Sequence, residues 1–196
     1  MNNAELVIPR QIDTEGDTAV ILDYATLHDL QAIHELELAL FPEEPWSIDM
    51  FLEEIQHETR TYCVLREGDR IIGYAGVMVV ADTADVQTIA VIPEREGRGY
   101  GRLLLNTLHQ LAQSRGAERI LLEVRADNPR AQQLYLRNGY TQIHLRRGYY
   151  EDGQDALIMM REFAPSASAE PDSAQDSYET NPYAAEYLHR GESHVY

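Results

Sequence analysis

The sequence predicts an α/β domain over residues 19–163, preceded by an extension (1–18) and followed by a tail (164–196). Strand-like and helix-like patterns alternate in the order strand, two helices, three strands, helix, strand, helix, two strands. Of the 196 residues, 44% are hydrophobic and 25% are charged, which suits one domain of ordinary size with a sizeable core. A glycine-rich passage from a strand into a helix is the strongest local signal.

The first predicted elements are a short apolar strand, Ala19–Asp23, and two helices. Thr26 and Asp29 have the spacing of a capping box, and the helix that follows repeats buried positions at steps of three and four. These positions are Leu30, Ile33, Glu37 and Leu40. The segment FPEEP ends this helix, and Ser47 can cap a second one. The apolar residues of the second helix are Met50, Phe51 and Ile55.

Strands follow in the middle of the domain. Thr61–Arg66 and Ile71–Val80 are rich in β-branched and aromatic residues, and the turn sequence EGDR between them predicts a hairpin. Val86–Ile92 is the third strand of this group, and Pro93 ends it.

The second half of the domain predicts two helices, each with a clear end. One has an apolar face and stops at Gly116. That face consists of Leu104, Leu108 and Leu111. The other begins with Asn128 as N-cap and Pro129 as first helical residue, and Gly139 ends it. The remaining predicted strands are Arg119–Val124, Thr141–Leu145 and Ala156–Arg161.

Both terminal segments have weaker patterns. In residues 1–18 only Leu6, Val7 and Ile8 could pair at a sheet edge. Residues 164–196 are acidic and poor in aliphatic side chains, so we expect a disordered tail. A short docking patch formed by Tyr183, Tyr187 and Leu188 is the alternative.

Composition excludes several functions. The net charge of −17 argues against direct binding of nucleic acid. All 16 basic residues are arginine, which excludes a lysine-dependent P-loop and Schiff-base chemistry. The single cysteine, Cys63, allows no internal disulfide, and Ile71–Ala81, the longest near-apolar stretch, is too short to span a membrane. Without a signal-peptide pattern, we expect a cytoplasmic protein.

The glycine loop between residues 97 and 101 predicts an anion site. Gly97, Gly99 and Gly101 leave backbone N–H groups uncovered where a helix begins, and the helix dipole adds positive potential there. The nearby cations are Arg95, Arg98 and Arg102. The alternative is that the glycines only form a tight turn. A Rossmann domain is disfavoured because hairpins precede the loop and no GxGxxG follows the first strand.

The runs TIAVIPEREGRGYGRLLL and LLEVRADNPRAQQLYLRNGY resemble the GCN5-related N-acetyltransferase (GNAT) superfamily over roughly residues 19–163. FPEEPWS, LEVRADN and RRGYYEDGQDALIM are similar to the RimI-type members, which acetylate the N-terminal α-amine of ribosomal proteins. The resemblance implies a central mixed sheet flanked by helices and acetyl-CoA as co-substrate.

The resemblance also assigns residues to the co-substrate. The strand before the loop would hold acetyl-CoA through Ile89, Ala90 and Val91, and Asn128 would be a further ligand. The loop contributes Gly97, Arg98, Gly99, Tyr100, Gly101 and Arg102. One position departs from the family, because Glu96 stands where Gln or Arg is usual. An acid beside a pyrophosphate weakens binding unless it points away.

Two residues are candidates for proton transfer. Glu123 lies in the apolar strand ILLEVR, where burial favours a general base, and its counterpart in RimI-type enzymes acts through a water. Pairing with Arg125 or Arg147 is the alternative. Tyr135 follows Asn128 by two helical turns, so both project from one side, and the resemblance makes Tyr135 the acid that protonates the leaving thiolate. Taken alone, Tyr135 could be a packing residue.

Other side chains have weaker assignments. Trp46, Tyr149 and Tyr150 lie in loops that would flank the peptide entrance, and either substrate contact or packing explains them. Cys63 has no histidine near it in sequence, so we expect an inert thiol. The seven histidines show no metal-binding spacing, so we expect no metal.

Together these features predict an N-acetyltransferase that moves acetyl from acetyl-CoA to the α-amine of a protein, expected to be the N-terminal alanine of a small-subunit ribosomal protein. Direct attack on the thioester is expected. An enzyme for lysine side chains or small amines, on the same fold, is the nearest alternative. A non-catalytic acyl-CoA-binding assembly module is another, although the presence of both Glu123 and Tyr135 speaks against it. The oligomeric state stays open.

Overall fold

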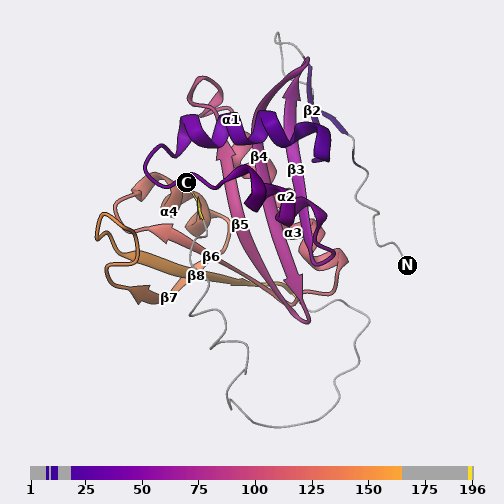
Figure 1. Cartoon of the computed structure of the whole chain (residues 1–196). Coiled ribbons are helices and arrows are strands. Elements are labelled where there is room, and N and C mark those ends of the chain that lie inside the picture. Colours follow the sequence, from indigo (N-terminus) through magenta and orange to yellow (C-terminus); the bar gives the residue numbers. More distant parts are fainter. Residues whose placement is uncertain (1–7, 9, 13–18, 165–193, 196) are drawn as a thin grey trace.

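The computed structural model describes residue 8 and residues 10–12, 19–164 and 194–195. Helices cover both faces of one sheet (Figure 1). The strands are β1 (Arg10–Ile12), β2 (Val20–Tyr24), β3 (Arg60–Glu67), β4 (Arg70–Val80), β5 (Thr83–Val91), β6 (Arg119–Arg125), β7 (Thr141–Arg146), β8 (Ala156–Glu162) and β9 (His194–Val195). The helices are α1 (Leu30–Leu40), α2 (Ile48–Gln56), α3 (Tyr100–Ser114) and α4 (Pro129–Arg137), with 3-10 turns at Leu27–Asp29 and Pro93–Arg95.

The sheet is mixed, as predicted. Its strand order is β1-β2-β3-β4-β5-β6-β8-β7, and β9 is added beside β5. β5 pairs in parallel with β6 and with β9, whereas the other neighbours are antiparallel. Every helix and strand predicted between Ala19 and Arg161 is present, with ends shifted by a few residues at most. No helix in the described part of the chain is long and apolar enough to cross a membrane.

Two strands form where the sequence predicted none. At the sheet edge, β1 is formed by Arg10–Ile12. Leu6 and Val7, two of the three residues expected to pair at an edge, lie outside the described residues. β9 forms within the segment expected to be a tail. Tyr183, Tyr187 and Leu188, the predicted docking patch, lie outside the described residues.

Local capping explains where the helices begin. The Asp29 carboxylate accepts hydrogen bonds from the backbone N–H and the hydroxyl of Thr26, both at 2.9 Å, and from Arg66 at 2.6 Å. Burial alone would raise the pKa of Asp29. The hydrogen bonds from Arg66 and Thr26 together outweigh burial, so the net pKa is lowered. Ser47 caps α2 by accepting from the N–H of Met50 at 3.2 Å.

The two faces of the sheet pack separate cores. α3 and α4 contribute to the larger core, which includes Leu104, Leu108, Tyr135 and Tyr140. α1, α2 and the loop between them form the second core, whose members include Ile33, Trp46, Phe51, Tyr74 and Ala90. Glu37 is fully buried in this region and accepts hydrogen bonds from the N–H of Trp46 at 3.0 Å and from the hydroxyl of Tyr74. The Glu37 carboxylate thus holds the α1–α2 loop on the sheet.

The sheet opens between β5 and β6. These strands are in register at only three positions, from Thr83 with Arg119 to Asp85 with Leu121. Just beyond, Gly76 of β4 faces Thr88 while Val77 faces Val86, which leaves Gln87 as an extra residue in β5. A bulge of this kind bends its strand, which accounts for the divergence of β5 from β6. β9 lies against the divergent part of β5, opposite Thr88 and Ile89.

Candidate active site

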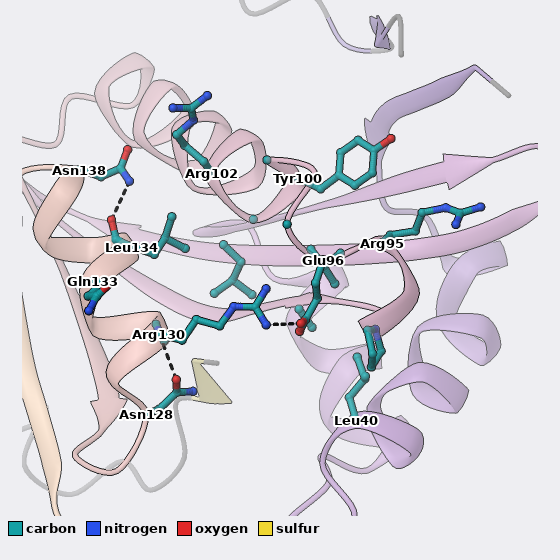
Figure 2. Close-up of a pocket in the computed structure, with 18 of the residues that line it drawn as sticks. Leu40, Arg95, Glu96, Tyr100, Arg102, Asn128, Arg130, Gln133, Leu134 and Asn138 are labelled. Carbon is teal, nitrogen blue, oxygen red and sulfur yellow. Dashed lines mark hydrogen bonds and ion pairs between the residues drawn. The ribbon is translucent and has the colours of Figure 1, made fainter. Parts of the chain in front are cut away.

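A cavity of about 810 Å³ lies between the end of β5, the glycine loop, the start of α3 and one face of α4 (Figure 2). Leu40 and Phe41, at the end of α1, complete its wall. The lining residues after β5 are Pro93, Arg95, Glu96, Gly97, Gly99, Tyr100, Gly101, Arg102, Asn128, Arg130, Ala131, Gln133, Leu134, Arg137 and Asn138.

The glycine loop adopts the backbone that its sequence requires. Gly97 and Gly99 have φ values of 74° and 86°, in the left-handed region that side chains disfavour. Gly99 is the N-cap of α3 and provides no side-chain cap, so the first N–H groups of the helix stay available at the cavity. A Cβ built at Gly97 or Gly99 meets no atom within 4 Å, so space is open above both residues. This end of the cavity suits an anion.

Arginines surround this end. Arg95 donates to Glu67 of β3 at 2.7 and 3.1 Å, which lowers the pKa of the carboxyl group and raises that of the guanidinium. Arg130 of α4 pairs with Glu96. Arg102 and Arg137 also line the cavity. The Glu96 side chain is therefore turned toward a cation across the cavity, as Figure 2 shows.

The cavity brings together nine of the ten residues that the sequence assigned to acetyl-CoA. They are Ile89, Ala90, Val91, Gly97, Gly99, Tyr100, Gly101, Arg102 and Asn128, whereas Arg98 is outside the lining. Asn128 is also the N-cap of α4, because its side-chain oxygen accepts from the N–H of Ala131 at 3.0 Å. The sequence analysis did not assign the α4 residues Arg130, Leu134 and Arg137 to the cavity. The spacing of Arg130, Leu134 and Arg137, at steps of four and three, is the signal that could have placed them on one helix face.

Glu123 lies outside this lining, on β6 at the other side of the opening. Its Oε1 accepts a hydrogen bond from Arg146 of β7 at 2.8 Å, and its side chain is 15% exposed. Its Oε2 is buried and has no hydrogen-bond partner among the described residues. The predicted alternative partners were Arg125 and Arg147. Arg125 instead contacts Asp127 and Asp152. Glu123 is therefore paired with an arginine, but with Arg146 and not with either predicted partner.

Tyr135 is fully buried on α4 and also lies outside the cavity lining. Its ring packs at an angle of 64° against Tyr140, with ring centroids 5.7 Å apart. Its hydroxyl has no hydrogen-bond partner among the described residues. Burial, with a smaller contribution from Tyr150, raises its pKa, so the phenol keeps its proton at physiological pH. Tyr135 thus combines ring packing against Tyr140 with a protonated hydroxyl that no described residue engages.

The loop after β7 is built around two tyrosines. The guanidinium of Arg146 lies 4.1 Å from the centroid of the Tyr149 ring, and that of Arg125 lies 4.7 Å from the Tyr150 ring. Arg146 therefore contacts both Glu123 and Tyr149. These cation–π contacts connect the loop to β6 and β7.

The α1–α2 loop meets this tyrosine loop. The N–H of Glu151 donates to Glu44 at 2.7 Å. Trp46, the third predicted substrate contact, is only 3% exposed and packs on Phe51 with ring centroids 5.4 Å apart. The burial of Trp46 favours the packing alternative over contact with a substrate.

Cys63 is fully buried in β3, and burial raises the pKa of its thiol to about 12. A thiol with this pKa holds almost no thiolate at neutral pH. Among residues 19–164, no group of three or more His, Cys, Asp or Glu side chains is arranged to hold a metal ion.

The sequence is similar to those of known acetyltransferases. The model of the acetyltransferase (GNAT) family matches residues 30–140. The N-alpha-acetyltransferase RimI of Mycobacterium tuberculosis is 39% identical over 156 residues, which cover 76% of this chain and 95% of the relative. The ribosomal protein bS18-alanine N-acetyltransferase of Salmonella typhimurium is 39% identical over 118 residues, which cover 59% and 79%.

A solved structure agrees with these relatives. The crystal structure of the ribosomal-protein-S18-alanine N-acetyltransferase from Escherichia coli matches with a TM-score of 0.70 and 31% sequence identity, and it covers 78% of this chain and 99% of that one. The family match and the relative from M. tuberculosis both span most of the domain that carries the cavity. The chain therefore belongs to the GNAT family of acetyltransferases.

Proposed function

We propose that this protein transfers acetyl from acetyl-CoA to the N-terminal α-amine of a protein, with the N-terminal alanine of a small-subunit ribosomal protein as the acceptor. The observation that carries the proposal is a cavity whose glycine end suits an anion, in a chain that is 39% identical to a relative named ribosomal protein bS18-alanine N-acetyltransferase. The match with the RimI protein covers 95% of that relative, so the proposal concerns a whole domain.

The cavity fits the co-substrate. Its open space above Gly97 and Gly99, next to the free N–H groups of α3, suits a pyrophosphate. The divergent end of β5 runs along the cavity at Ile89, Ala90 and Val91, where an extended pantetheine arm can pair with the backbone. Acetyl-CoA supplies the thioester from which the acetyl group leaves.

Glu123 and Tyr135 supply opposite proton transfers in this proposal. Glu123 accepts the proton of the attacking amine through a water, using the Oε2 that Arg146 leaves unengaged. Tyr135 donates its proton to the departing sulfur, and its raised pKa keeps it in the donor form. An α-amine has a pKa of about 7.7–8.0, against about 10.4 for lysine, so a base of modest strength suffices.

A three-way acceptor assay tests the proposal. Purified protein receives acetyl-CoA and one of three acceptors: a peptide that begins with Ala, the same peptide with a blocked N-terminus and one free Lys, or a polyamine. We expect turnover on the free α-amine alone. Preference for Lys or the polyamine would favour the nearest alternative, and CoA binding without turnover would favour an assembly module. Labelled acetyl-CoA in a cell lysate then identifies the acetylated N-terminus.

A further inference from the structure

We propose that Arg130 is a positioning residue for the co-substrate, which acts by neutralising Glu96 and holding its carboxylate away from the anion end of the cavity. This inference rests on the proposed function, because acetyl-CoA is the anion concerned. It also explains how the chain tolerates an acid at the position where its sequence departs from the family.

Among the described residues that line the cavity, Glu96 is the only one with a carboxylate, and it stands immediately before Gly97 of the loop. The same lining contains Arg95, Arg102, Arg130 and Arg137. A negative charge at this position would oppose the phosphates of acetyl-CoA, because like charges a few ångströms apart repel even where solvent screens them. The loop therefore needs a counter-charge for Glu96.

Arg130 provides that counter-charge from the opposite wall. Its guanidinium extends from the first turn of α4 toward the loop and pairs with Glu96, as Figure 2 shows. Arg95, the cation adjacent in sequence, is engaged with Glu67 on the other side. The ion pair thus joins two elements that the cavity separates.

The pair contributes little to folding. The side chains of Arg130 and Glu96 are 67% and 41% exposed, and exposed ion pairs add little to stability. The main effect of the pair is on the electrostatic potential inside the cavity. Substitutions at either position should therefore leave a folded protein, which allows binding to be measured directly.

A double-mutant cycle tests this role. Kd for CoA is measured by calorimetry, at low salt, for the wild type, Arg130→Ala, Glu96→Gln and the double variant, with thermal melting to verify folding. We expect Arg130→Ala to weaken binding about tenfold in the wild-type background, because Glu96 is then unneutralised. In the Glu96→Gln background, the same change should cost about twofold or less. Arg130→Lys should restore most of the binding.

Arg137→Ala is the matched control. Arg137 lines the same cavity on the same helix, and its contribution should be equal whether residue 96 is Glu or Gln. An equal cost of Arg130→Ala in both backgrounds would overturn the inference and make Arg130 an independent phosphate ligand. No effect of Arg130→Ala in either background would overturn it as well. If the wild type fails to bind CoA, the proposed function fails with it, so the two failures are distinguishable.

Discussion

At the scale of single residues, Glu123 and Tyr135 have contrasting surroundings. Glu123 has one oxygen bound to a guanidinium and the other buried without a partner in the described part of the chain. Tyr135 is enclosed by apolar and aromatic neighbours, and burial keeps its phenol protonated. A carboxylate and a protonated phenol are the pair that amine attack on a thioester needs. Each makes a separate prediction.

Glu123→Gln should lower kcat by about 10²–10⁴, because the amide keeps the shape of the side chain but cannot accept the proton. Steady-state assays with an Ala-initiated peptide measure kcat. The Kd for acetyl-CoA is the internal control and should stay close to that of the wild type. A kcat that is unchanged from pH 6 to 9 would exclude Glu123 as the base.

Cys63→Ala should keep essentially full turnover, whereas Tyr135→Phe should slow the chemical step. The buried thiol of Cys63 is not activated, so the acetyl group passes directly to the amine and kinetics should be sequential. Single-turnover assays measure the step that Tyr135 affects. Parallel double-reciprocal lines, or an acetyl group trapped on Cys63, would instead indicate a covalent intermediate.

The sequence predicts residue positions better than residue partners. Nine of the ten predicted acetyl-CoA residues share one cavity because they lie in two contiguous runs and a helix cap. The partner of Glu123 could not be predicted, because Arg146 is on β7 and β8 lies between β7 and β6 in the sheet. Which residues of β6 and β7 meet depends on the order of the strands in the sheet, and sequence periodicity carries no information about that order.

At the scale of elements, the site depends on the loop that starts α3 and on the edge of β5 that diverges from β6. The loop gains its anion affinity from uncovered N–H groups. The extra residue Gln87 bends β5 away from β6, and β9 joins β5 along this edge at Thr88 and Ile89. A negative charge in the glycine loop should therefore weaken CoA binding. A segment that pairs with the backbone of β5 should compete with CoA.

Gly99→Asp should abolish CoA binding without unfolding the domain. The new carboxylate would stand at the N-cap of α3, beside the phosphates. Gly99→Asn is the matched control, because asparagine has the same size, no charge, and tolerance for the left-handed backbone at φ 86°. Calorimetry should show that the Asn variant retains measurable binding. Tight binding by the Asp variant would mean that the loop is only a turn.

Removing residues 191–196 should tighten the binding of CoA, because β9 pairs with β5 at Thr88 and Ile89, next to the proposed path of the pantetheine arm. The apparent Kd should fall on truncation by the factor that corresponds to the fraction of molecules in which β9 is undocked. A synthetic peptide of the last six residues should then compete with CoA on the truncated protein. An unchanged Kd would show that β9 and CoA do not compete.

Elements with local signals were predictable, and those without them were not. Ser47 and Asn128 mark helix starts in the sequence and are the N-caps of α2 and α4. Thr26 is the N-cap of the 3-10 turn that leads into α1. β9 has no such signal, because its formation depends on a free strand edge about a hundred residues away in sequence.

At the scale of the whole molecule, one buried histidine makes the stability of the fold depend on pH. His109 of α3 is 4% exposed, and its Nδ1 accepts from Arg161 of β8 at 2.9 Å. Its Nε2 must then carry the hydrogen, which it donates to the hydroxyl of Tyr140 at 2.9 Å. Burial, and then the charge of Arg161, lowers the pKa of His109 to about 4.

This pKa predicts acid sensitivity between pH 6.5 and 4. In that range the unfolded chain binds a proton at residue 109 and the folded chain does not, so stability falls as the pH falls. The loss between pH 7 and pH 5 should be about 2 kcal/mol. Urea denaturation at both values measures it. His109→Gln should remove this part of the pH dependence, whereas the exposed His28→Gln should retain it. Equal pH dependence in all three proteins would contradict the assignment.

The position of Trp46 also makes its intrinsic fluorescence useful. It is the only tryptophan in the sequence, and it lies in the core that contains both Phe51 of α2 and Ala90 at the cavity. Its backbone is held by Glu37 and its ring packs on Phe51, so the indole reports on the α1–α2 loop and on the core beneath it. Selective excitation of this ring therefore provides an intrinsic fluorescence signal for movement of the loop beside the acetyl-CoA cavity, without any added label.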